Sequence, residues 1–432
     1  MRQLLADKIS GSLVGIWALV PEHLRLGTWD LVCGWSGQSG ETLQPRLALQ
    51  LINEAALCVS HLRKSRTLSQ KGFELANGLP YVVSDPAVNK TLESHSVLDA
   101  LRMQTALGRI RRASGHYKGK LLAIDPHMIR TTTKRQTARC YLNGQSKPAK
   151  ALQLFFCLDV DTKQVVGFTI GTSSRALKQA TPQLLDLADD ILQPSPDECL
   201  ILADAKHYVT DIVDYIHSHS PFQFLIPVPG YKYFMKKYKT IPADQFTSRW
   251  AGYATACIPY SMRDTDAGPL YLMVQRSGEK PSEYQFNGFL TNTDCSEVDA
   301  MALHYPKRWN VEGFFNVRQA LGWDRAGTLN LHIAYARMTM ALAAQAATHQ
   351  LRQRLGKPFA DWDALHFARN VLAGLDGDVR VADDTILVTY YNAPNLGPLQ
   401  SQLEHLPSRL SNENIDPRIP WLFDYKLDFR FK

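Results

Sequence analysis

The chain has 432 residues, of which 45% are hydrophobic and 21% are charged, so its composition is that of a folded globular protein and not a disordered one. This length allows two or three domains, each with its own core. The formal net charge of +7 favours partners that carry negative charge. No apolar run approaches the ~20 residues that a membrane-spanning helix needs, which excludes an integral membrane protein.

The N-terminal region, residues 1–117, is predicted to be mostly helical. Its apolar stretch at 11–20 follows no cluster of positive charges and precedes no small-residue cleavage site, so it predicts a buried helix and not a signal peptide. The clearest helix is SHSVLDALRMQTALGRIRRAS at 94–114, with a serine cap at its start and arginines in its last turn.

From residue 120 the pattern changes to short apolar runs that alternate with helical segments. KLLAIDPHMI predicts a buried strand with Asp125 at its exit, and ECLILADAKHYV predicts a second strand that ends at Asp204. The segments around them predict a hairpin at 151–171, helices at 175–192 and 210–219, and a strand at 222–229. This order predicts an α/β fold in which helices flank a mixed sheet.

Residues 231–295 show a polar pattern typical of β-strands, and a helix is predicted to follow in HYPKRWNVEGFF. In that helix Tyr305, Arg308 and Glu312 are three and then four residues apart, so they share one face. A solvated helix with an ion pair between Arg308 and Glu312 is the plainer interpretation of this spacing. A long packed helix at 329–355 and a hairpin at 378–392 are predicted in the remainder of the chain.

Two basic segments stand out beyond the overall excess of positive charge. Residues 130–150 include Lys134 and Arg135 and contain no acid, and YKYFMKKYK at 231–239 interleaves four lysines, among them Lys236 and Lys237, with four aromatic residues. Such segments suit the phosphate backbone of a nucleic acid, although a solvated surface accounts for either one alone.

The candidate catalytic residues are three carboxylates. An aspartate at the end of an apolar strand is often only a helix cap or a turn residue, and this alternative applies to Asp125 and Asp204 taken singly. Together with Glu312 in its basic setting they form a set that suits Mg²⁺, which prefers carboxylate oxygens, water and phosphates as ligands. Two such ions ~3.5–4 Å apart can activate a water or a 3′-hydroxyl and stabilise the leaving oxygen of a phosphodiester.

The motifs AIDPH, LADAKHY and YPKRWNVEGFFNVRQALGW resemble those of the DDE transposases of bacterial insertion sequences, over roughly residues 121–349. Asp125 and Asp204 are 79 residues apart, and Glu312 follows after another 108. One subgroup of these enzymes has a β-rich insertion before the glutamate and a Tyr-x-x-Arg-x-x-x-Glu-x-x-x-x-x-x-Lys signature. Tyr305, Arg308 and Glu312 match that signature.

The match departs from the family at the last position of the signature. Gln319 stands where the lysine is expected, and Arg318 precedes it. On a helix, Gln319 keeps the right face without the charge, whereas Arg318 keeps the charge about 100° away. The role of that lysine therefore does not transfer with confidence to either residue, and Arg318 is kept as a candidate DNA contact.

The resemblance implies a ribonuclease-H-like catalytic fold and an organisation in five parts. These are a helical DNA-binding region at 1–117, the first part of the catalytic core at 118–230, a β-rich insertion at 231–298, the glutamate helix and following helices at 299–375, and a C-terminal region at 376–432. Asp125, Asp204 and Glu312 are expected to be catalytic and to bind two Mg²⁺ ions, for which Mn²⁺ can substitute. The expected DNA contacts are Tyr305, Arg308, Arg318, Lys134, Arg135, Lys236 and Lys237.

The function that the resemblance implies is transposition. The protein is expected to bind the terminal inverted repeats of an insertion sequence, cleave the DNA with Mg²⁺ and join the freed 3′-hydroxyl to target DNA, as a homodimer on double-stranded DNA. The scattered cysteines, odd in number and without a C-x-x-C pair, argue against a zinc ribbon or a disulfide framework. A cytoplasmic, bacterial and nucleoid-associated protein with no membrane partner is therefore expected.

Two alternatives stay open. The first is a ribonuclease-H-like nuclease or a domesticated transposase, which cuts DNA without joining it. The second is a DNA-binding protein whose acids are structural, and it predicts salt-sensitive binding without metal-dependent cleavage. Nearby polar residues have plainer interpretations, because Asp159 and Asp161 fit a turn and His207 fits a polar loop.

Overall fold

The structure is a computed structural model that describes most of the chain. The described residues are 4–5, 7–59, 68–131, 136, 139–141, 147–172, 177–265, 267–293, 305, 308, 321 and 328–432. The chain divides into two compact units. The terminal unit comprises Met1–His116, Thr131–Arg135 and Phe315–Lys432, and the central unit comprises Tyr117–Arg130 and Gln136–Phe314.

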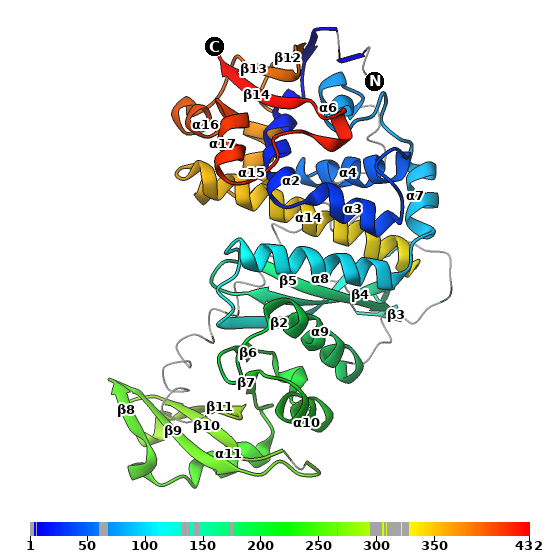
Figure 1. The fold of residues 1–432 in the computed structure, drawn as a ribbon. Helices are drawn as coiled ribbons and strands as arrows, with labels where there is room; N and C mark the ends of the chain where they lie inside the picture. The colour runs from blue at the N-terminus through cyan, green and yellow to red at the C-terminus, as the bar shows by residue number, and fades with distance from the viewer. Residues whose placement is uncertain are drawn as a thin grey trace. The chain divides into compact units, whose positions relative to one another are not determined.

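The terminal unit is built around one long helix, α14 (Leu331–Leu355), most of which is buried because it carries alanine, leucine and methionine on nearly every side. Helices from the beginning of the chain pack on it (Figure 1). They are α2 (Val20–Arg25), α4 (Leu43–Ala56), α7 (Asp85–Glu93) and α8 (Val97–Ala113), while α3 (Thr28–Ser36) packs on α4 and α8, and α6 (Lys71–Ala76) packs near the N-terminal strand. The later helices are α15 (Ala364–Phe367), α16 (Leu396–Leu403) and α17 (Leu406–Asn412).

Two predicted helices of this unit are confirmed. Helix α8 begins with a capping box, in which the Asp99 backbone N–H donates to Ser96 Oγ over 3.2 Å and the Ser96 backbone N–H donates to Asp99 Oδ2 over 2.9 Å. The apolar stretch near the N-terminus is buried as predicted, but it forms a 3-10 helix, η1 (Val14–Leu19), before α2 begins.

A four-stranded sheet completes the terminal unit and joins the two ends of the chain. Its strand order is β1 (Ile9–Gly11), β12 (Gly377–Ala382), β13 (Thr385–Tyr390) and β14 (Lys426–Phe431). Strands β12 and β13 form the predicted hairpin, and the aromatic C-terminal segment pairs parallel to β13.

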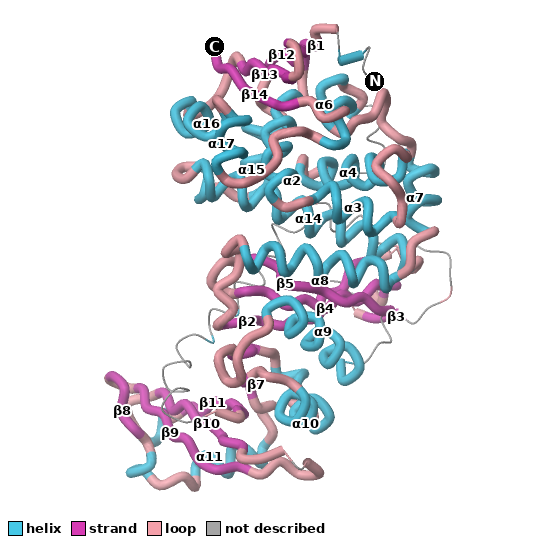
Figure 2. The backbone as a smooth tube through the Cα atoms, in the orientation of Figure 1, coloured by secondary structure: helices cyan, strands magenta, loops and turns pink. Residues whose placement is uncertain are grey.

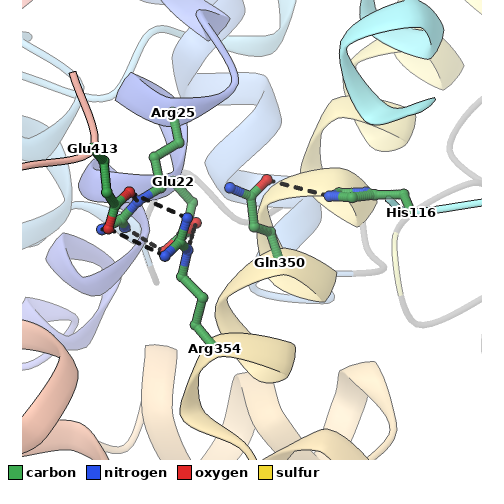
Figure 3. A network of polar contacts seen from close by, with 6 residues as sticks. All are labelled: Glu22, Arg25, His116, Gln350, Arg354 and Glu413. Carbon is green, nitrogen blue, oxygen red and sulfur yellow. Dashed lines mark hydrogen bonds and ion pairs between the residues drawn. The ribbon is translucent and has the colours of Figure 1, made fainter. Parts of the chain in front are cut away.

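Helices α2, α14 and α17 bring four charged side chains together in the terminal unit (Figure 3). Glu22 is 1% exposed and lies 2.8 Å from Arg25 Nη1 and 3.4 Å from Arg354 Nε. Glu413, just after α17, accepts hydrogen bonds from both arginines over 2.7–3.3 Å. The two carboxylates and two guanidinium groups sum to a neutral set, here named the charge quartet.

The central unit contains a mixed sheet, in agreement with the predicted α/β class (Figure 2). Its strand order is β3 (Arg139–Cys140), β4 (Ala149–Asp159), β2 (Leu121–Arg130), β6 (Leu200–Leu202), β7 (Gln223–Pro227), β11 (Gln285–Thr291), β10 (Leu270–Ser277), β9 (Tyr253–Tyr260) and β8 (Thr247–Trp250). Strand β5 (Gln164–Thr172) pairs with β4. Helix α9 (Leu177–Leu192) packs on β4 and β5, and α10 (Thr210–His219) packs on α9 and β7.

The predicted β-rich segment after residue 230 continues this sheet. Strand β11 pairs antiparallel with β7, from Thr291 opposite Leu225 to Phe289 opposite Pro227, and β8 to β10 extend the sheet beyond it. The prediction is wrong for its first residues, because 232–239 form a helix, α11 (Lys232–Lys239). The pattern of lysines and aromatic residues there follows the period of a helix, with Phe234 and Tyr238 on its buried side.

The cysteines and the membrane prediction can be checked only on the described residues. Five cysteines are free thiols (Cys33, Cys58, Cys140, Cys157 and Cys199), whereas Cys257 is disulfide-bonded, which the scattered spacing did not predict. None of the helices among the described residues combines the length and the apolar character needed to cross a membrane.

Candidate active site

The sheet of the central unit brings Asp125 and Asp204 to the same edge. Strands β2 and β6 are parallel neighbours, with Ala123 in register with Leu202. Asp125 lies inside β2, which continues to Arg130 and does not end at the aspartate as predicted, whereas Asp204 follows the end of β6. Each aspartate comes two positions after its paired residue, so the two lie at the same level of the sheet. Each side chain is 19% exposed, which leaves the carboxylates at the border between core and solvent.

Asp204 is held by the turn that it begins. It caps the short 3-10 helix η2 (Ala205–His207), and its Oδ1 accepts a hydrogen bond from the Lys206 backbone N–H over 3.1 Å. His207 Nδ1 lies 2.7 Å from the same oxygen. Burial acts to raise the pKa of Asp204, but the hydrogen bond and charge of His207, with the charges of Lys206 and Arg308, outweigh it and lower the pKa. Asp204 is therefore both a cap and an ionised group.

His207 differs from its prediction as a polar loop residue. Its side chain is 2% exposed and packs beneath the Asp204 carboxylate. A hydrogen on Nδ1 donates to the carboxylate, which fixes the orientation of Asp204. The signal available in the sequence was the spacing Asp-x-x-His in LADAKHY, which is short enough for one turn to join the two side chains.

Asp125 has the opposite electrostatic balance. Burial and the neighbouring Asp204 raise its pKa to about 6, although Arg308, His207 and Lys206 act in the other direction. The closest of these charges is Arg308 Nη1, at 3.7 Å from Asp125 Oδ1, which is longer than a hydrogen bond. The aspartate pair thus retains negative charge that the described protein groups do not fully offset.

Tyr305 and Arg308 reach the same edge, as their shared helical face predicts. The Tyr305 hydroxyl donates to the Ala203 carbonyl over 3.0 Å, next to Asp204 in the chain, and its ring packs edge-on against Phe289 at 4.8 Å. The Arg308 guanidinium lies 5.7 Å from the centre of the Tyr305 ring. Both side chains are half-buried, so within the free chain they support the aspartate edge.

Other predicted site residues differ in what the structure says of them. Glu312, Arg318, Lys134 and Arg135 lie outside the described residues. Lys236 is exposed on α11, whereas Lys237 is half-buried with its Nζ 4.5 Å from the centre of the Tyr260 ring. The turn interpretation of Asp159 is confirmed, because its buried carboxylate accepts hydrogen bonds from the backbone N–H groups of Lys118, Gly119 and Thr162.

The chemistry of the aspartate pair fits a hard divalent cation. Two carboxylates whose mutual repulsion raises one pKa gain free energy when a cation lies between them. The described residues contain no group of three histidine, cysteine or acidic side chains arranged to hold a metal. Asp125 and Asp204 therefore offer part of a ligand set, and a third ligand has to come from outside the described residues, from substrate or from water.

A pair of carboxylates at the edge of a mixed sheet, beside an arginine and a tyrosine, has groups that suit a cation and a phosphate. The family model of the transposase DDE domain matches residues 116–346, about half of the chain. The chain belongs to this family. It is a DDE transposase.

Two further comparisons add little. No curated protein matches the chain. Among solved structures, the cryo-EM structure of a piggyBac transposase synaptic complex with hairpin DNA is similar over 82% of this chain and 79% of that chain, with 13% identity and a TM-score of 0.44. A likeness of that size has no bearing on the fold or the chemistry of this chain.

Proposed function

We propose that this transposase binds the terminal inverted repeats of an insertion sequence and catalyses DNA cleavage and strand transfer with divalent metal ions held by Asp125, Asp204 and Glu312. The observation that carries the proposal is the pair of aspartates that the adjacent parallel strands β2 and β6 bring together, in which burial and Asp204 raise the pKa of Asp125. Mg²⁺ is the proposed ion, two are expected, and Mn²⁺ can substitute.

The strand arrangement supports a ribonuclease-H-like catalytic core. Strands β5, β4 and β2 form an antiparallel set, and β6 and β7 follow parallel to β2 on its other side. Within this framework we propose the catalytic core at 118–230 and 299–375, the insertion at 231–298, the DNA-binding helices at 1–117 and a separate C-terminal region at 376–432.

The residues at the site have distinct proposed tasks. Asp125 and Asp204 offer oxygen ligands, and Glu312 would complete the set. His207 keeps the Asp204 carboxylate in one orientation through the contact of 2.7 Å. Arg308 lies close enough to Asp125 to offset part of its charge before DNA arrives, and its guanidinium suits a phosphate through paired hydrogen bonds.

The metal supplies Lewis acidity to the phosphate and lowers the pKa of a water or 3′-hydroxyl when it is bound. The protein contributes rigidity, because both aspartates lie on or next to strands of a large sheet. Two DNA ends have to be cut together, so we propose a homodimer on the DNA. The remaining expected contacts, Lys134, Arg135 and Arg318, are proposed on the resemblance and their charge alone.

The test begins with the DNA immediately outside the gene on both sides. Short inverted repeats flanked by a small direct duplication would supply both ends of the substrate. A supercoiled plasmid that carries the two ends is then incubated with the protein and Mg²⁺. We expect cuts at the ends and joined products, both lost with EDTA. Asp125→Ala and Glu312→Gln should abolish cutting and leave end binding intact.

The outcomes separate the proposal from its rivals. Nicking by Glu312→Gln at the wild-type rate would show that the site assignment is wrong. Metal-dependent cuts without joined products would favour the nuclease or domesticated transposase. Salt-sensitive binding without any cleavage would favour a DNA-binding protein with structural acids.

A further inference from the structure

Helix α11 has two faces of different character. On a helix with 100° per residue, Lys232, Lys236 and Lys239 fall within a 60° arc, and all three are exposed. Phe234 and Tyr238 lie about 130–170° from the middle of this arc and are 5% and 2% exposed. The three lysines, here named the lysine stripe, therefore face solvent on the side away from the buried face.

The surroundings add to this positive charge. Residues 215–243 contain no acidic residue, so the sequence around the stripe supplies no local counter-charge. Tyr231 and Tyr233 flank the stripe and are 63% and 64% exposed. Tyrosine hydroxyls, like lysine ammonium groups, are common donors to DNA phosphates.

Lys237 belongs to neither face. It is half-buried, and its Nζ lies 4.5 Å from the centre of the Tyr260 ring, a cation–π distance. Lys236 and Lys237, which were both predicted as DNA contacts, therefore differ in their surroundings. Lys236 is exposed on the stripe, whereas Lys237 packs against Tyr260 of β9.

The helix is anchored to the turn that carries Asp204. The Tyr208 ring, one residue after η2, packs edge-on against Phe234 at 5.9 Å, and its hydroxyl lies 2.9 Å from the Tyr260 hydroxyl. Strands β6 and β7 are parallel, with Leu202 in register with Leu225, so the segments that leave them toward Asp204 and toward α11 start from the same edge of the sheet (Figure 1).

We infer that the lysine stripe of α11 binds the phosphate backbone of the substrate DNA next to the aspartate pair. Charge complementarity and the anchoring of α11 to the Asp204 turn select DNA phosphates as its occupant. The inference rests on the proposed function, because it gives the DNA of that reaction a place on the central unit.

The test compares full-length variants with a fluorescein-labelled duplex of about 30 base pairs of arbitrary sequence, in EDTA, by anisotropy across about 50–300 mM KCl. The logarithm of the association constant falls as the logarithm of the salt concentration rises, and each lost phosphate contact reduces the magnitude of this negative slope by about 0.9. K232Q/K236Q/K239Q should reduce the magnitude of the slope by about 2–3. K237Q should leave it within about 0.5 of the wild-type value, and K232R/K236R/K239R should retain it.

An unchanged slope in the triple glutamine variant would overturn the inference, and so would an equal loss in K237Q. Far-UV circular dichroism checks that each variant is folded. The plasmid assay separates this result from the proposed function. If the triple glutamine variant has a slope of smaller magnitude but the wild-type protein never cuts the plasmid, DNA binding by the stripe is supported and the proposed nuclease chemistry is refuted. If the slope of the triple variant is unchanged but the wild-type protein cuts, the nuclease chemistry is supported and DNA binding by the stripe is refuted.

Discussion

The charge quartet of the terminal unit and the aspartate pair of the central unit both contain carboxylates that are largely shielded from water. In the quartet each carboxylate contacts two arginines, and the four charges cancel. At the sheet edge two carboxylates share one arginine at 3.7 Å, and the pKa of Asp125 rises to about 6 through burial and Asp204. The comparison teaches that the first set contains its own counter-charges, whereas the second leaves one carboxylate with a raised pKa, which the proposed cation would relieve.

The largest effect is expected from Asp204→Asn. The amide can still accept the hydrogen bonds from Lys206 and His207, so the fold should remain within about 1 kcal/mol of wild type. It cannot carry the charge that a metal site requires, and initial cutting rates on the two-ended plasmid should fall at least about 1000-fold, or ~4 kcal/mol. Cutting within tenfold of wild type would remove Asp204 from the site.

Replacing a carboxylate of the charge quartet by an amide should lower the stability of the fold and leave DNA cutting unchanged. Glu22→Gln leaves Arg25 and Arg354 with only Glu413 as a partner in a setting where Glu22 is 1% exposed. Breaking a buried ion pair costs about 3–5 kcal/mol, so the midpoint of urea unfolding should fall. Glu413→Gln, at a residue that is 33% exposed, is the matched control and should cost less. Cutting per folded molecule should be unchanged in both variants.

Asp125→Asn should stabilise the metal-free chain. The folded pKa of about 6 exceeds the ordinary value of 3.8, so the folded chain binds more protons between these values. Stability therefore declines as pH rises from about 4 to 6 and stays reduced above, by up to ~3 kcal/mol. The asparagine variant should lack this decline when urea unfolding is followed in EDTA. A wild-type stability that rises relative to the variant over this range would contradict the assignment.

A smaller effect is expected at His116 in the terminal unit. Burial and the Arg111 charge lower its pKa to about 3, and it contacts Gln350 through Nε2 over 3.2 Å. The unfolded chain takes up this proton near pH 6.5, so stability is lost as pH falls, by ~2 kcal/mol at pH 5. His116→Gln should flatten that loss in urea unfolding. The exposed His332→Gln is the control, and equal flattening there would refute the prediction.

The sequence predicted the parts of the fold that depend on local patterns. Apolar runs bounded by polar residues identify β2, β6 and β7, and Asp204 follows β6 as predicted, whereas β2 continues past Asp125 to Arg130. The parallel register that joins Asp125 and Asp204 was implied only by the family resemblance, because pairing between distant strands leaves no local signal. The union of the chain's two ends in one unit was not predicted, because contacts between distant segments also leave no local signal.

The misses have physical reasons. Helix α11 was predicted as part of a polar β segment, because four aromatic residues among lysines raise strand propensity while the helical period spans only eight residues. The sequence indicates a polar loop for His207, because its burial depends on tertiary packing that the local pattern does not show. Sequence spacing does not show that Lys237 packs against the Tyr260 ring while Lys236 is exposed, and contact of either residue with DNA stays a prediction.

The pairing of β7 with β11 bears on the distance between the point where DNA is bound and the point where it is cut. It makes α11 and the two aspartates parts of one continuous sheet structure, with no flexible linker among the described residues from 200 to 265. A backbone gripped at the lysine stripe would then meet the aspartates at a fixed number of nucleotides. The distance between the stripe and the aspartates would then set the cleavage position, and the sequence of the bases between the two points would not be needed to specify it.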